Sequence, residues 1–136
     1  MASVLKVNTL TGVTTAGSIV VTGEGNSTTT NLQQGLAKVW VNFNGSGTVA
    51  IRDSYNVSSI LDEGTGDYTI NFTNSMANSN YNFVGAGQQA VSNINREMLI
   101  PGDTAPTESA LQLWTSTHGA LLDFAFISVS NFGDLA

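Results

Sequence analysis

The chain has 136 residues, enough for one domain of ordinary size, and only 10% of them are charged. Four basic and ten acidic residues give a formal net charge of −6, which argues against a nucleic-acid-binding domain because phosphate groups need cations. No apolar run approaches the roughly 18 residues of a membrane span, so no membrane insertion is expected. Without Cys there is no disulfide, thiolate metal site or cysteine nucleophile.

Neutral hydrogen-bonding residues make this chain polar. Thr, Ser, Asn and Gly together account for 58 of the 136 residues. Short polar side chains compete with helices for backbone groups and favour turns and strands. Residues Met1 to Val7 also lack the pattern of a secretory signal peptide, so we expect no such leader.

The first 31 residues are predicted to form an extended N-terminal arm for attachment and oligomerisation. Two weak strands are expected there, one over Val4–Leu10 and one over Ser18–Thr22. Their apolar side chains are too few to offset the entropy of ordering the segment, so the arm is either disordered or ordered by neighbouring chains. Residues Asn31–Leu36 could form one helical turn, since Leu32 and Leu36 have i, i+4 spacing.

Alternating apolar and polar residues predict strands in the remainder of the chain. In Leu36–Phe43, the residues Lys38, Trp40 and Asn42 alternate with apolar ones, as in a half-buried strand. The other predicted strands are Thr48–Asp53, Tyr55–Ile60, Tyr68–Thr73, Tyr81–Ala86, Ala110–Ser116 and Leu121–Ser130.

Short strands at this spacing, separated by Gly and Asn turns, predict an all-β fold. We expect an antiparallel β-sandwich or jelly-roll-like domain over residues 32–136, preceded by the arm of residues 1–31. In the last predicted strand the apolar face changes between Phe126 and Ile127, which indicates a bulge or burial on both sides.

Few residues are candidates for catalysis or metal binding. His118 is the one His in the chain and no hydrolase motif accompanies it, so a turn or surface position is the favoured interpretation. Asp62, Glu63 and Asp67 could bind a hard cation such as calcium, but Asp and Gly are also what a hairpin turn requires, and we favour the turn. We therefore expect no enzyme, no cofactor and no structural metal.

Two tryptophans lie on the strand faces opposite the aliphatic residues. An aromatic side chain on a polar face is often an interface residue, although the core of a two-sided sheet is the alternative. The candidate interface residues are Val4, Leu5, Val7, Leu10, Trp40 and Trp114.

The segment Met98–Glu108 is the least regular part of the globular region. Two Pro and a Gly shape it, and loops on a sheet scaffold commonly carry recognition. The alternative is a structural crossover between sheets. The candidate recognition residues are Pro101, Asp103, Pro106 and Glu108.

Three segments carry a resemblance to a known family. They are NLQQGLAKVWVNFNG at Asn31–Gly45, TVAIRDSYNVSSI at Thr48–Ile60 and GTGDYTINF at Gly64–Phe72. Together they resemble small virion structural proteins of marine tailed bacteriophages, of the cyanophage type, and modules like the C-terminal domains of tail fibres. The opening Leu5–Gly12 is similar to the starts of such proteins, and the resemblance is most specific from Gln33 to Phe72.

The resemblance implies a β-rich, trimeric appendage of the phage particle without enzymatic activity. We therefore expect a short fibre or knob subunit on the virion surface, attached to other virion proteins through its arm and able to contact a host-surface glycan or protein. One alternative is a capsid decoration protein on the head lattice. Another is a glycan-binding adhesin that stacks sugars on Trp114, Tyr81 or the Pro101–Glu108 loop. A depolymerase is disfavoured, because no acid pair or catalytic triad is apparent.

Overall fold

The computed structural model describes residues 4–12, 19–23, 27–88 and 96–136. The chain divides into two compact units, Met1–Leu36 and Ala37–Ala136. The division falls five residues beyond the arm predicted from the sequence.

The first unit contains a short antiparallel hairpin, which the sequence analysis missed. Strand β1 (Val20–Thr22) pairs with β2 (Thr29–Asn31). Strand β1 lies within the strand predicted over Ser18–Thr22, whereas its partner β2 was not predicted. The region after β2 makes one hydrogen-bonded turn, with the Gly35 N–H donating to the Asn31 carbonyl at 3.3 Å, but it is not a helix.

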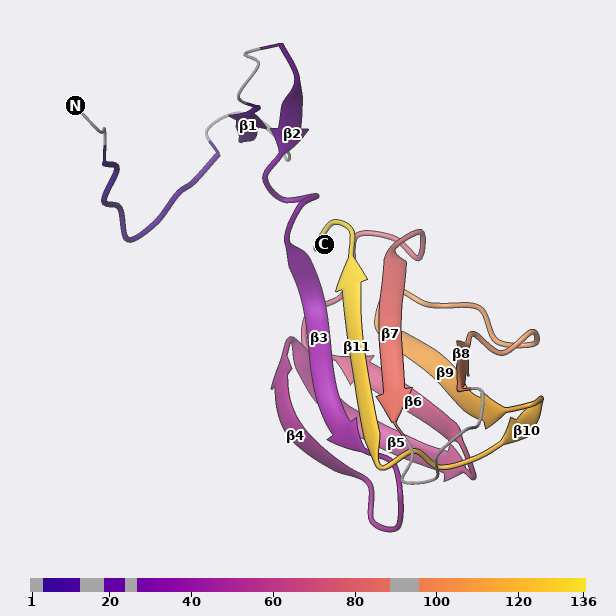
Figure 1. Ribbon diagram of the computed structural model, residues 1–136. Coiled ribbons are helices and arrows are strands. Elements are labelled where there is room, and N and C mark those ends of the chain that lie inside the picture. Colours follow the sequence, from indigo (N-terminus) through magenta and orange to yellow (C-terminus); the bar gives the residue numbers. More distant parts are fainter. Residues whose placement is uncertain (1–3, 13–18, 24–26, 89–95) are drawn as a thin grey trace. The chain divides into compact units, whose positions relative to one another are not determined.

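The second unit is an antiparallel β-sandwich of two sheets, which confirms the predicted fold class (Figure 1). One sheet has the strand order β4-β3-β11-β7 and the other β10-β9-β6-β5, with β8 also paired to β9. The first sheet consists of β3 (Ala37–Asn44), β4 (Ala50–Tyr55), β7 (Asn82–Gln88) and β11 (Phe126–Phe132). The second consists of β5 (Val57–Gly64), β6 (Asp67–Phe72), β8 (Glu97–Leu99), β9 (Ala110–Thr117) and β10 (Ala120–Leu121).

Alternation along the strands places one face of each sheet in a shared core. On β3 the buried apolar side chains are Val39, Val41 and Phe43, and on β6 they are Tyr68, Ile70 and Phe72. The complete core consists of Val39, Val41, Phe43, Tyr68, Ile70, Phe72, Met76, Leu111, Leu113, Phe124, Ile127 and Val129.

Two glycines on the inner face of β7 let the second sheet approach closely. A Cβ on Gly85 would lie 2.8 Å from the Met98 side chain, and one on Gly87 would lie 2.3 Å from the Phe124 ring. A Cβ at Gly87 would clash with the buried Phe124 ring, whereas the end of the flexible Met98 side chain can move away from a Cβ at Gly85. Gly87 is therefore the position that depends on the absence of a side chain.

The predicted strand Leu121–Ser130 was wrong as one element. The structure divides it between β10 and β11, which belong to different sheets, and the intervening residues cross from one sheet to the other. The crossing segment carries Phe124 fully into the core. This crossing accounts for the change of apolar face, while the register shift of β11 against β3 lies between Asn131 and Phe132 instead.

The phenol of Tyr68 joins the two sheets through polar contacts inside the core. Its hydroxyl lies 2.9 Å from the Gly45 carbonyl oxygen, at the end of β3, and 3.0 Å from Asp123 Oδ1 in the crossing segment. The Gly66 N–H donates to the same carboxylate oxygen at 2.7 Å. Burial, and then the hydrogen bond and charge of Asp123, raise the pKa of Tyr68 above its ordinary range, so the phenol stays protonated as a donor.

Asn131 is a polar exception in the core. It is fully buried on β11, on the same face as Ile127 and Val129, and neither amide atom has a hydrogen-bond partner among the described residues. A buried polar group without a partner retains the cost of its desolvation. Asn131 therefore lowers the stability of the sandwich.

We predict that Tyr68→Phe lowers the free energy of unfolding by about 1–3 kcal/mol, since the buried contact of the phenol with the Gly45 carbonyl is lost together with its contact to Asp123 Oδ1, which keeps only the Gly66 N–H as a donor. Urea unfolding followed by fluorescence measures the change. Tyr55→Phe is the control, because Tyr55 is 52% exposed and should leave stability within about 0.5 kcal/mol. Equal stability of the Tyr68→Phe variant would show that the phenol does not join the sheets.

Asn131→Leu is expected to raise the free energy of unfolding by about 1–3 kcal/mol, because an apolar side chain of similar shape removes two unpaired polar atoms from the core. Asn71→Leu provides the comparison, since the Asn71 amide donates to Ser59 Oγ at 3.1 Å and its removal should give no gain. Thermal melts compare the melting temperatures of both variants with that of the unsubstituted chain. A lower melting temperature for Asn131→Leu contradicts the prediction.

Candidate functional site

The structure separates the two predicted interface tryptophans. Trp40 lies on the outer face of β3 and Trp114 on the outer face of β9, which belong to different sheets of the sandwich. Both positions alternate with buried core residues, as the sequence pattern predicted. One surface cannot include both side chains, because the sandwich core lies between the two outer faces.

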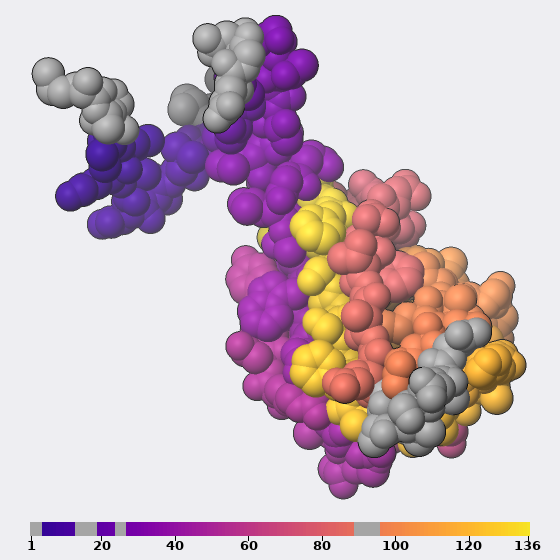
Figure 2. Space-filling view, in the orientation of Figure 1, coloured from indigo at the N-terminus to yellow at the C-terminus, as the bar shows by residue number. Residues whose placement is uncertain are grey.

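Side chains from all four strands form one row across the outer face of the four-stranded sheet. Strand register aligns Tyr55 on β4, Trp40 on β3, Ser130 on β11 and Val84 on β7. The row thus runs from two large aromatic residues to small ones. Figure 2 shows this face, with β11 in yellow between β3 in purple and β7 in salmon.

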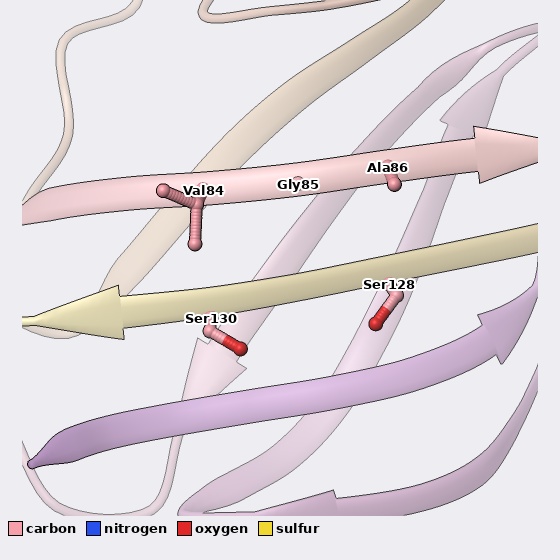
Figure 3. A pocket seen from close by; sticks show the side chains of 5 residues that line it. All are labelled: Val84, Gly85, Ala86, Ser128 and Ser130. Atoms are coloured by element: carbon pink, nitrogen blue, oxygen red, sulfur yellow. The ribbon is translucent and has the colours of Figure 1, made fainter.

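A shallow, open hollow of about 290 Å³ lies over β7 and β11 on the same face. It is lined by Val84, Gly85, Ala86, Ser128 and Ser130. Figure 3 shows the side chains of Val84, Ala86 and the two serines on one side of these strands, with the other sheet behind. Sequence reasoning missed this hollow, although small residues at alternate positions of two strands were a visible signal.

Arg52 borders this face on the β4 side. Its guanidinium lies 5.3 Å from the centre of the Phe126 ring, and Nη2 donates to the Ala125 carbonyl at 2.6 Å. A cation over an aromatic ring is attracted by the ring's negative face. Arg52 is thus held against the start of β11, where Phe126 remains 43% exposed.

Trp114 lies in a different setting on the five-stranded sheet. It is opposite Asp67 on β6 and Leu99 on β8, and its indole Nε1 is buried without a hydrogen-bond partner among the described residues. A sugar hydroxyl has no access to a donor that is already covered. The indole edge is therefore a poor candidate for glycan recognition.

The three clustered carboxylates belong to the β5–β6 hairpin, and each accepts a hydrogen bond, two from within the hairpin and one from β9. The donors are the Gly64 N–H for Asp62, the Thr69 hydroxyl for Glu63 and the Gln112 amide for Asp67. In the part of the chain that the structure describes, no three such groups are placed to hold a metal ion.

His118 occupies the first position of the two-residue turn between β9 and β10. Its φ is 50° and that of Gly119 is 78°, the two positive angles that a tight hairpin turn of the type I′ class requires. The imidazole is exposed at this turn. Its position follows from the hairpin geometry.

The candidate recognition loop is fixed at both of its ends. Pro101 is buried and Pro106 half-buried, whereas Asp103 and Glu108 are exposed. Tyr81 holds the far end, because its hydroxyl lies 3.1 Å from the Thr107 carbonyl and 3.0 Å from that of Ala110.

The Tyr81 ring in turn packs edge-on against Phe72 with centroids 5.8 Å apart. Tyr81 is therefore engaged in holding the loop, which weakens its case as a sugar-stacking residue.

Most apolar side chains in the described residues of the arm are exposed. The exposed fractions are 75% for Val4 and 79% for Leu5, and both Val7 and Leu10 are more than half exposed. No helix within the described ranges has the length and apolar character to cross a membrane.

Comparisons with known proteins give no relative: no family model, curated protein or solved structure matches this chain. The phage-family resemblance therefore remains an expectation drawn from the sequence.

Burial raises the pKa of Tyr81 from its ordinary value of 10.0 to about 12. Between these values the unfolded chain loses the phenolic proton while the folded chain keeps it, so stability is complete below pH 10 and falls as pH rises toward 12. We predict a shallower fall for Tyr81→Phe, measured by urea unfolding at pH 9 to 12. A slope identical to that of the unsubstituted chain contradicts the prediction. The remaining slope combines Tyr68, whose pKa is also raised, with Lys38, whose pKa is lowered by burial.

Proposed function

We propose that this chain is a non-enzymatic structural subunit of a bacteriophage particle, a short fibre or knob that assembles as a homo-oligomer, most simply a trimer. The sandwich would stand on the particle surface, and the N-terminal arm would attach it to other virion proteins. Contact of the sandwich with a host-surface glycan or protein is a secondary part of the proposal.

The observation that carries the proposal is the contrast between the two units. The sandwich has its own apolar core, whereas the arm has a hairpin of three-residue strands and several apolar side chains in solvent. An isolated two-stranded hairpin is marginally stable at best. Apolar side chains on an arm of this kind are accounted for if another protein surface covers them.

The setting of the candidate catalytic and ligand residues supports a structural role. His118 forms a turn, and the carboxylates of the β5–β6 hairpin accept hydrogen bonds from other residues of the sandwich. The Tyr81 hydroxyl is hydrogen-bonded to the end of the Pro101–Glu108 loop. These side chains are used to build the fold, so the described residues give no specific observation in favour of the adhesin over the structural subunit.

The attachment role is tested with charge variants of the arm. Leu5→Asp should prevent incorporation into phage particles assembled in cells that lack the normal chain, because a carboxylate replaces an apolar contact. Asn8→Asp adds the same charge nearby and should incorporate normally. Immunoblots of purified particles give the readout, and circular dichroism checks that the sandwich stays folded. Normal incorporation of both variants would overturn attachment through the apolar residues of the arm.

A further inference from the structure

We propose that the outer face of the four-stranded sheet β4-β3-β11-β7 is the surface through which copies of this chain associate. The aromatic side of the face, formed by Tyr55 and Trp40, would pack into the hollow over β7 and β11 of the next copy. This inference rests on the homo-oligomer proposed above and names the surface that forms it.

The apolar exposure of this face is the first argument. Tyr55 is 52% exposed, Val84 50% and Phe126 43%, and the three lie on three strands of one sheet. Exposed apolar side chains that share one face are typical of an interaction surface. The outer face of the five-stranded sheet also exposes Leu61, Leu99 and Leu121, so charge is what distinguishes the two faces.

The shape of the face is the second argument. Across one registered row, aromatic side chains stand on β4 and β3, while a serine stands on β11 beside the hollow. The next row repeats the pattern on the hollow side, with Ser128 on β11 opposite Ala86 on β7. A projection and a recess at different places on one surface allow one copy to fill the recess of the next, and such contacts close into rings when the rotation permits.

Charge is the third argument, and it selects this face over the other. The strands of the five-stranded sheet carry four carboxylates and no Lys or Arg, namely Asp62, Glu63, Asp67 and Glu97. The strands of the four-stranded sheet carry Asp53 with Arg52 and the buried Lys38.

Two copies, each with a formal charge of −6, repel one another. They meet at lowest electrostatic cost where carboxylates are fewest, and that is the face with the hollow. A second copy of this chain therefore fits the face better than it fits the acidic sheet.

The direct test substitutes matched residues on the two outer faces. Val84→Arg places a cation beside the hollow, and Leu61→Arg places the same cation on the outer face of β5, where Leu61 is 52% exposed. Sedimentation equilibrium should show the unsubstituted chain and Leu61→Arg as oligomers of equal mass. The mass of Val84→Arg should fall toward that of one chain, 14.2 kDa.

The outcomes separate this inference from the function on which it rests. An unsubstituted chain that sediments as a monomer overturns both. If the unsubstituted chain is an oligomer and Val84→Arg has the same mass, the homo-oligomer stands and its assignment to this face is wrong. Circular dichroism of Val84→Arg should match that of the unsubstituted chain; if the variant is unfolded, Ser128→Arg takes its place in the hollow.

Cross-linking tests the geometry of the contact, because the chain has no Cys of its own. A mixture of Tyr55→Cys and Ser130→Cys chains should form disulfide-linked pairs between the two variants after exchange of subunits under mild oxidation. Each variant alone should cross-link much less. Equal cross-linking within each single variant overturns the packing of the aromatic side into the hollow.

Discussion

Burial of one face from each sheet in a common interior is the constraint on which the sandwich depends. Strand periodicity assigns alternate residues to that interior, so Val39, Val41 and Phe43 point inward while Trp40 points outward. The two sheets can approach only where side chains leave room, and Gly85 and Gly87 provide that room beside Met98 and the Phe124 ring. Apolar burial at roughly 25 cal/mol per Å² is the main stabilising term for such an interior.

Polar groups inside the sandwich have opposite effects on its stability. The Tyr68 hydroxyl and the Gly66 N–H both meet Asp123, so the carboxylate of the crossing segment has donors from the hairpin side. The amide of Asn131 has no such partner among the described residues. The first arrangement fixes how the chain crosses between sheets, whereas the second reduces stability at a buried position opposite Val39 and Phe83.

The arm and the outer face of the four-stranded sheet both expose apolar side chains to solvent. In the arm, Val4, Leu5, Val7 and Leu10 are exposed rather than packed in a core. On the four-stranded sheet, Tyr55 and Val84 are about half exposed. Coverage by other protein surfaces would remove both exposures. The fibre subunit proposed above would need one attachment to the particle and one to its own copies, and in that proposal the arm makes the former and the sheet face the latter.

The sequence by itself determined the all-β class and the faces of most strands, because alternation and Gly or Asn turns are local signals that need no partner strand. It missed β2, β8 and the turn at Asn56 between β4 and β5. It placed Trp40 and Trp114 correctly on outward faces but could not say that these faces belong to opposite sheets. It also joined β10 to β11, since a run of apolar residues such as Leu121–Ile127 is the same locally whether it continues one strand or crosses the core. Only the tertiary structure decided these points, because strand pairing and the hollow between β7 and β11 arise from contacts between residues far apart in the chain, such as Ser130 and Val84, which are 46 positions apart.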